Sequence, residues 1–131
     1  MVNRTPQFED VLGPLAAAIV REVTARGEAS VADVVEGLRR TQRRERAYTT
    51  IMTVMGRLHE KGVLGRDRRG RQYFYRPAAP EAELIDRLSG VAVDRVVERY
   101  GAAALRHFAV KLGDLDPDTR RRLAALADEP E

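Results

Sequence analysis

The 131-residue sequence contains no cysteine, and this absence removes several kinds of chemistry at once. Without thiols there is no structural disulfide, no thiolate metal site and no cysteine nucleophile. The lack of cysteine also fits an intracellular protein. The two histidines, His59 and His107, lack the i, i+4 partner and the carboxylate spacing of a zinc-binding helix. We therefore expect neither a metal ion nor another cofactor.

Long apolar segments are absent as well. The longest apolar run, residues 11–20, has ten residues and is interrupted by a Gly-Pro pair, whereas a membrane-spanning helix needs about 20 residues. The first ten residues, MVNRTPQFED, lack the apolar region of a signal peptide. The sequence also contains no P-loop, dinucleotide fingerprint or nucleophile elbow. We therefore expect a cytoplasmic protein that is not an enzyme.

Charge is distributed unevenly along the chain. Residues 1–80 contain 15 Lys and Arg against 9 Asp and Glu, a net charge of +6, whereas residues 81–131 contain 8 against 11, a net charge of −3. A basic front half suggests contact with a polyanion, and an acidic back half suggests a separate task. Charge alone leaves open the alternative of solvated surface arginines.

Three helices are predicted in the front half. The first runs from Pro14 to about Ala25, with proline at its first position and Gly27 as its stop. The second begins at Ser30, which forms a start resembling a capping box with Asp33. The third runs from about Tyr48 to Lys61, with an apolar side of Ile51, Val54, Met55 and Leu58.

Two short strands follow the third helix. Residues 63–67 and 72–76 have strand composition, and Arg69-Gly70 is expected at the turn between them. Tyr73 and Tyr75 share one face by the two-residue strand period. A helix with an apolar side and a small polar side, followed by a basic hairpin, is typical of a winged helix-turn-helix DNA-binding domain. We assign this domain to residues 1–77.

The segment Pro77-Ala78-Ala79-Pro80 is the predicted linker, and residues 81–131 read as a helical tail. Helices are expected over residues 81–100, residues 102–112 and from Asp116-Pro117 onward. Three helices in some 50 residues bury little core by themselves, so a second copy of the tail is the simplest partner. The alternative is that the tail packs on its own DNA-binding domain. The residues expected at the dimer contact are Leu84, Leu88, Val91, Val96, Leu105, Phe108, Leu112, Leu123 and Leu126.

The polar side of the third helix supplies the candidate DNA contacts. Thr49, Thr50 and Thr53 can bond phosphates or base edges, unless the first two merely cap the helix. Met52 can pack on a thymine methyl group or lie at the edge of the core. Tyr48 can bond a phosphate through its hydroxyl or belong to the core. The arginines of the hairpin are expected at phosphates or in the minor groove, or at a solvated tip: Arg66, Arg68, Arg69 and Arg71.

The residues also carry a resemblance. The run AYTTIMTVMGRLHEKG, followed by GRQYFYRP, closely resembles the BlaI/MecI family of bacterial transcriptional repressors, the penicillinase repressors. The opening LGPLAAAIV and the helix start SVADVV are similar to the family too. The resemblance extends from Leu12 to Leu126 and is strongest over residues 47–77. It departs from the family in having Val23 where a tryptophan is common, and in lacking the cysteine-rich tail of the copper-responsive relatives.

The resemblance implies a mainly α fold with a small β-wing, in which a winged helix-turn-helix domain is joined to a C-terminal helical dimerisation tail. It implies a homodimer that represses transcription from a palindromic double-stranded DNA operator. It also implies a DNA contact by Arg57, for which a surface salt bridge to Glu60 is the alternative. In the family, a membrane-bound antibiotic sensor triggers proteolysis within the tail, and the similar bond here is His107–Phe108.

Two other functions remain open at the level of sequence. A winged-helix domain can act as a protein-interaction module that no longer reads DNA, with its basic wing against an acidic partner. A regulator of this size can also sense a ligand in its tail, although the tail stripes hold few polar groups that would orient one.

Overall fold

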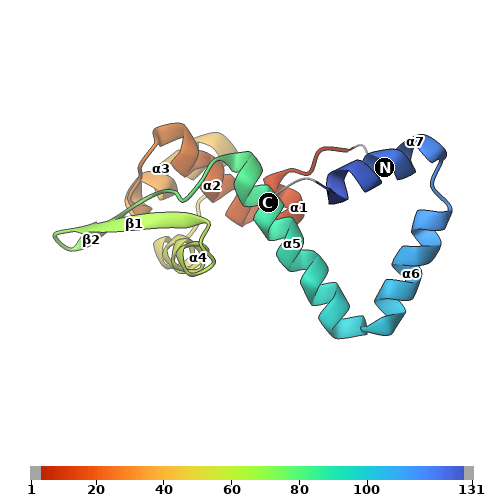
Figure 1. The fold of residues 1–131 in the computed structure, drawn as a ribbon. Helices are drawn as coiled ribbons and strands as arrows, with labels where there is room; N and C mark the ends of the chain where they lie inside the picture. Colours follow the sequence, from red (N-terminus) through yellow and green to blue (C-terminus); the bar gives the residue numbers. More distant parts are fainter. Residues whose placement is uncertain (1–3, 129–131) are drawn as a thin grey trace. The chain divides into compact units, whose positions relative to one another are not determined.

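The structure, a computed structural model, describes residues 4–128 (Figure 1). The outermost ends of the two expected domains, residues 1–3 and 129–131, lie outside the described residues. The chain divides into two compact units, one of residues Pro6–Ser89 and one that starts at Gly90 and includes residues 4 and 5. The described elements are α1 Phe8–Leu12, α2 Pro14–Arg26, α3 Val31–Gln42, α4 Tyr48–Glu60, β1 Leu64–Arg69, β2 Gln72–Pro77, α5 Glu81–Tyr100, α6 Ala102–Gly113 and α7 Pro117–Ala127.

The first unit is a winged helix-turn-helix: α2, α3 and α4 enclose one apolar core, and β1 and β2 form the wing (Figure 1). This confirms the predicted fold class. Each helix contributes the apolar side that its sequence period predicts. The larger core side chains with no exposed surface are Ile19, Val20, Val23, Val34, Ile51 and Met55.

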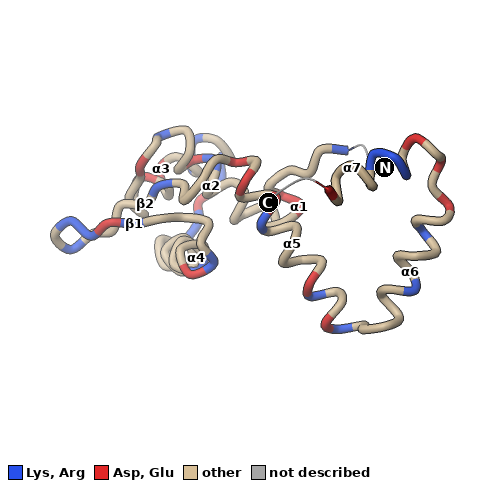
Figure 2. Tube along the Cα trace, in the orientation of Figure 1, with Lys and Arg blue, Asp and Glu red and all other residues tan. Residues whose placement is uncertain are grey.

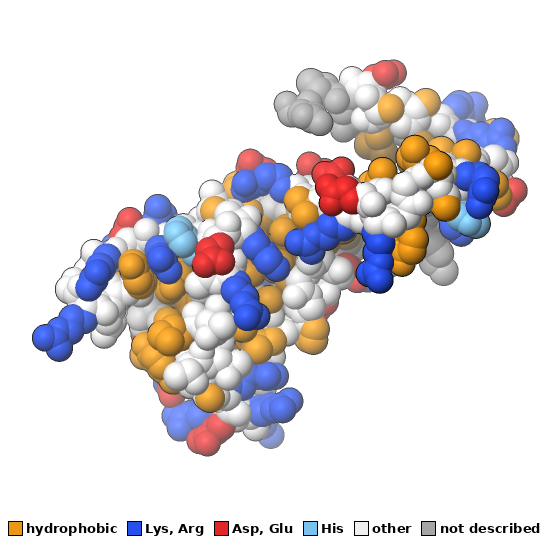
Figure 3. All heavy atoms as spheres, turned by 90° about the horizontal axis from the view of Figure 1, so that it is seen from below, with side chains coloured by type: hydrophobic (Ala, Val, Ile, Leu, Met, Phe, Trp, Pro, Cys, Tyr) orange, Lys and Arg blue, Asp and Glu red, His pale blue; other side chains and the backbone are white. Residues whose placement is uncertain are grey.

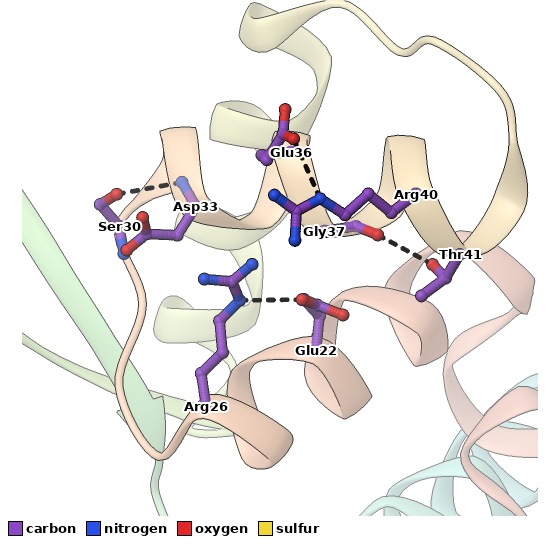
Figure 4. Close-up of polar contacts among 8 residues, drawn as sticks. All are labelled: Glu22, Arg26, Ser30, Asp33, Glu36, Gly37, Arg40 and Thr41. Atoms are coloured by element: carbon purple, nitrogen blue, oxygen red, sulfur yellow. Dashed lines mark hydrogen bonds and ion pairs between the residues drawn. The ribbon is translucent and has the colours of Figure 1, made fainter.

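The helix starts follow the predicted capping chemistry. Pro14 is the first residue of α2, and Gly27, with a φ of 79°, ends that helix in a conformation that disfavours a side chain. Ser30 and Asp33 form a complete capping box, because the Asp33 amide donates to Ser30 Oγ at 3.1 Å and the Ser30 amide donates to the Asp33 carboxylate at 2.9 Å (Figure 4). The short helix α1 was not expected from the sequence, and it buries Phe8 in the core.

A glycine lets α2 and α3 approach closely. Gly37 is buried in α3, and a Cβ atom built on it would overlap the carboxylate of Glu22 and lie 2.9 Å from Glu22 Cγ. The Glu22 carboxylate is held there by Arg26, whose Nε donates to it at 2.8 Å (Figure 4). The Glu22 side chain is only 16% exposed, so it has little room to move aside.

The wing is an antiparallel hairpin with a two-residue loop. Arg69 pairs with Gln72, which leaves Gly70 and Arg71 as the loop, one residue later than the expected Arg69-Gly70 turn. Gly70 has a φ of 64°, and glycine at the first loop position is what a type II′ hairpin turn requires. The wing is joined to the α2–α3 turn by two backbone hydrogen bonds between Ala29 and Tyr75, at 2.9 and 2.8 Å.

The start of α5 belongs to the first unit. Leu84 and Ile85 are buried in the winged-helix core, and Leu88 packs against it, so the division between units falls inside α5 and not at residues 77–80. Hydrophobic burial explains this position, because the first turns of α5 cover apolar core that would otherwise face water. Leu84, which the sequence pattern placed on a dimer contact, is therefore covered by its own chain. Leu88 is partly buried against the same core.

The second unit consists of the rest of α5 with α6 and α7. Asp116 caps α7 as expected, since its carboxylate accepts the Thr119 amide at 2.8 Å, and this hydrogen bond holds the pKa of Asp116 below its usual range. Among the described residues from Gly90 onward, only Ala104 and Thr119 are buried. Hydrophobic side chains reach the surface of these helices (Figure 3).

The contact between Gly37 and Glu22 yields a stability prediction. Gly37→Ala should destabilise the protein, because its methyl group displaces Glu22 and breaks the pair with Arg26. In a Glu22→Ala background the clash is gone, and the same change should stabilise α3 by about 1 kcal/mol through helix propensity. Denaturant unfolding of the four proteins at one concentration measures both values. Equal effects of Gly37→Ala in the two backgrounds would contradict the close approach.

Candidate nucleic-acid interface

The polar side of α4 is open to solvent. Thr49, Thr50, Thr53 and Arg57 are all exposed, while Ile51, Met55 and Leu58 on the opposite side are buried. Tyr48 is 52% exposed and Met52 is 46% exposed. Neither side chain belongs to the core, which was the alternative for each. The apolar side of α4 thus anchors the helix and leaves its small polar side to an external partner.

The threonines are not used to cap α4. The N-cap residue is Ala47, and no side chain accepts a hydrogen bond from the first turn. The first-turn amides, which lack partners within a helix, therefore remain available. No acidic residue lies in that turn, so the positive end of the helix dipole is not neutralised. This end of α4 is electrostatically suited to a phosphate.

The side chain of Arg57 makes no ion pair or hydrogen bond with another residue of the described chain, so the alternative of a salt bridge to Glu60 is not seen. It lies two turns after Thr50 on the same exposed side of α4. Arg43 and Arg44, in the turn before α4, are also exposed and have no partner within residues 4–128. Cations without an intramolecular partner can bind a polyanion without first breaking a contact.

The strand register sorts the wing arginines onto two faces. Residues paired across an antiparallel hairpin share a face, so Arg66, Arg68, Tyr73 and Tyr75 lie together on what we call the inner face. A groove of about 230 Å³ separates this face from α4, lined by Tyr48 and Met52 on one side and by Tyr73 and Tyr75 on the other. The inner face therefore looks toward the N-terminal part of α4.

Two of these arginines differ in how they are held. The guanidinium carbon of Arg66 lies 3.9 Å from the ring centre of Tyr73, and its Nη1 donates to the Tyr75 hydroxyl at 3.3 Å. Stacking fixes the guanidinium plane and leaves its other donors at the edge. Arg68 donates only to the Gly70 carbonyl oxygen, at 3.2 Å. Arg71 has no partner in the described chain, and the tip of the hairpin is correspondingly basic (Figure 2).

The outer face of the wing is neutralised. There, Arg76 donates to the Asp67 carboxylate at 2.9 Å, and Arg69 makes two hydrogen bonds to Glu28, at 2.5 and 2.8 Å. Hydrogen bonding to Glu28 raises the pKa of Arg69 above its ordinary value. Sequence reasoning placed all four loop and strand arginines together. It missed Glu28, which lies 41 residues before Arg69 and carries no local signal.

Nδ1 of His59 donates to the Leu64 carbonyl oxygen at 3.1 Å, which ties the end of α4 to β1. Within residues 4–128, no group of three or more His, Asp or Glu side chains is arranged to hold a metal ion. None of the helices described is long and apolar enough to cross a membrane.

An exposed polar helix side next to a basic, aromatic wing defines a winged helix-turn-helix DNA-binding regulator. Comparison with known proteins agrees. The family model described as penicillinase repressor matches residues 12–129. Transcriptional regulator BlaI from Mycobacterium tuberculosis, in strains CDC 1551 and H37Rv, is 34% identical over 119 residues, which cover 87% of this chain and 83% of the relative.

The chain therefore belongs to the penicillinase repressor (BlaI/MecI) family. It is a DNA-binding transcriptional repressor of this family and not an enzyme. The match extends over both the winged-helix unit and the helices beyond Gly90. The expected family is thus confirmed.

Proposed function

We propose that the protein represses transcription as a homodimer bound to a palindromic operator. Each protomer places the polar side of α4 in a major groove and the inner face of the wing against the adjacent backbone. The observation that carries this proposal is that the side chains of Arg57 and Arg71 lack partners in the described chain. Arg57 shares the exposed side of α4 with the threonines, and Arg71 lines the groove opposite Tyr48 and Met52. The same helix contacts bases or phosphates through Tyr48, Thr49, Thr50, Met52 and Thr53.

The dimer is supported by the state of the second unit. Few of its described residues are buried, and large apolar side chains stay exposed on all three helices. Large apolar side chains left exposed in such number favour an interaction site. A second copy of the same helices gives the symmetric, self-complementary partner that a two-fold operator requires. The contact residues proposed here are Val91, Val96, Leu105, Phe108, Leu112, Leu123 and Leu126.

Genome-wide recovery of DNA bound by the purified protein at physiological salt tests the function. We expect a short inverted repeat near promoters, with half-sites on the order of 10 bp apart or a multiple of it. Arg57→Met should weaken binding to the recovered motif, because it removes a cation that no residue of the described chain neutralises. Arg39→Met is the matched control, since Arg39 is paired with Glu36 on α3.

Motif-free binding that vanishes as salt rises would contradict the operator proposal. It would favour the protein-interaction module, whose wing meets an acidic protein surface. Equal operator affinity of Arg57→Met and wild type would remove Arg57 from the interface.

Gly56 gives a second prediction about α4. A Cβ atom built on it meets no atom of the chain within 4 Å, so the fold has no need of glycine there. Glycine costs about 1 kcal/mol in a helix, and Gly56 follows Met52 by one turn on the exposed side. We expect Gly56→Ala to raise stability by up to about 1 kcal/mol and to weaken operator binding, because its methyl group separates α4 from the base edges.

The control for this prediction is Gly90→Ala, a helical glycine in α5 with equally open surroundings. It should raise stability without changing DNA affinity. Thermal unfolding and a binding titration on each variant make the comparison. Unchanged operator affinity of Gly56→Ala would show that α4 does not approach DNA at that point.

Dimerisation is tested at Leu105, which is 57% exposed. Leu105→Arg places a charge in the proposed apolar contact, and desolvating an unpaired charge is strongly unfavourable. We expect sedimentation to show monomers and operator affinity to fall, because one protomer engages one half-site. Arg106→Gln, at the neighbouring exposed position, should leave the dimer intact. A Leu105→Arg protein that stays dimeric would exclude this surface.

Inactivation is proposed to occur by proteolysis between His107 and Phe108, by a protease linked to a membrane sensor of antibiotic or cell-wall stress. Both residues are exposed, but they lie inside α6, so cleavage requires local unwinding of that helix. Mass spectrometry of induced cells should find a fragment that begins at Phe108. Release of DNA by intact protein would contradict cleavage and favour a ligand-sensing regulator.

A further inference from the structure

The two acidic residues that contact wing arginines both act on the outer face. Asp67 is cross-strand to Phe74 and pairs with Arg76, while Glu28 reaches Arg69 from the turn between α2 and α3. The inner face, with Arg66 and Arg68, has no acidic partner among the residues described. The wing therefore carries its uncompensated positive charge on the side that looks toward α4.

The contact between Glu28 and Arg69 has an unusually complete geometry for a surface pair. Both carboxylate oxygens accept a hydrogen bond, from Nη1 at 2.5 Å and from Nη2 at 2.8 Å. The same guanidinium lies 4.9 Å from the ring centre of Phe74, so its plane is also packed. Exposed pairs are usually weak, but bidentate arginine–carboxylate pairs are the exception because both groups are fixed in one geometry.

The contact between Glu28 and Arg69 holds the loop end of the wing. An isolated two-stranded hairpin is only marginally stable in water. The backbone bridge between Ala29 and Tyr75 holds the wing near the end of β2, and the contact of Glu28 with Arg69 holds it next to the loop. Both attachments come from two consecutive residues of the α2–α3 turn. Together they fix the direction in which the hairpin projects from the core.

We propose that Glu28 and Arg69 are positioning residues, in which a carboxylate of the α2–α3 turn holds the wing tip and keeps Arg69 off the DNA. The phosphate contacts of the wing then come from Arg66, Arg68 and Arg71. This inference rests on the proposed operator binding and divides the wing arginines that the sequence treated alike. It assigns a role to Glu28.

The presence of DNA favours keeping this pair together. If Arg69 turned to a phosphate, Glu28 would lose its partner and leave a bare carboxylate beside a polyanion. Arg68 and Arg71 can bind phosphate without such a loss, because neither is paired with an acid in the described chain. The salt dependence of binding counts the phosphates that are neutralised, so it distinguishes the two kinds of arginine directly.

The first test compares Arg69→Met with Arg68→Met and Arg71→Met in full-length protein on one DNA duplex. Methionine keeps an apolar stem against Phe74 and removes the charge. We expect Arg68→Met and Arg71→Met each to flatten the slope of log K against log salt by about 0.9, the value for one phosphate contact. Arg69→Met should leave the slope unchanged. A slope lowered by Arg69→Met, or by neither control variant, would overturn the assignment.

The second test needs no DNA and separates this inference from the operator proposal. Glu28→Gln should speed amide hydrogen exchange in β1 and β2 of the free protein, while exchange in α2 stays as in wild type. The charge-swapped variant Glu28→Arg/Arg69→Glu should restore slow exchange in the wing. Unchanged exchange in Glu28→Gln would overturn the positioning role. If wild-type protein bound no DNA, the operator proposal would fail while this result still stood.

Discussion

The burial of one side of α4 is the constraint on which the rest of the structure depends. Ile51, Met55 and Leu58 are inserted between α2, α3 and the start of the wing, and none of them is more than 2% exposed. Because a helix is rigid, fixing its apolar side also fixes the direction of Thr49, Thr53 and Arg57 on the other. The polar side needs no contact of its own to be held in place. Its groups are left open, as binding to an external partner requires.

The direction of the wing is fixed in a different way from that of α4. A hairpin has no core, so its direction has to be set by attachment to the rest of the unit. The burial of Tyr75, the backbone pairing of Ala29 and the contact between Glu28 and Arg69 provide three attachments along its length. Glu28 and Asp67 contact arginines of the outer face, whereas Arg66 and Arg68 lie on the inner face without an acidic partner among the described residues. The uncompensated positive charge of the wing is therefore concentrated on its inner face.

Much of this organisation was predictable from local patterns. The limits of α2, the capping box of α3, the course of α4 and the Asp116 cap follow from helix periodicity and capping, which act within a few residues. The family resemblance of residues 47–77 pointed to the wing and to the DNA-binding class, and the comparisons bear this out. The residues singled out for DNA contact lie on α4 or the wing, and all of them except the half-buried Arg66 are exposed, but their individual roles stay predictions.

The features that could not be predicted from the sequence depend on contacts between residues far apart in the chain. Glu28 has no feature that points to Arg69, because their contact exists only after the wing folds onto the α2–α3 turn. For Leu84, the sequence pattern identified an apolar residue but predicted the wrong packing partner. Its position on the apolar stripe of α5 is periodic and correct, yet periodicity cannot say what the stripe packs against. The Pro-Ala-Ala-Pro segment suggested a break between domains, whereas the core extends past it into the first turns of α5.

The boundary between the two units lies within α5. Leu84 and Ile85 anchor the beginning of α5 in the winged-helix core, whereas Val91 and Val96 in its later turns are exposed. The tail helices bury little by themselves, and in the proposed dimer their stability would depend on protomer concentration. Cutting α6 would then remove the apolar surface that holds the dimer, and each winged helix would keep only the weaker affinity of a single half-site.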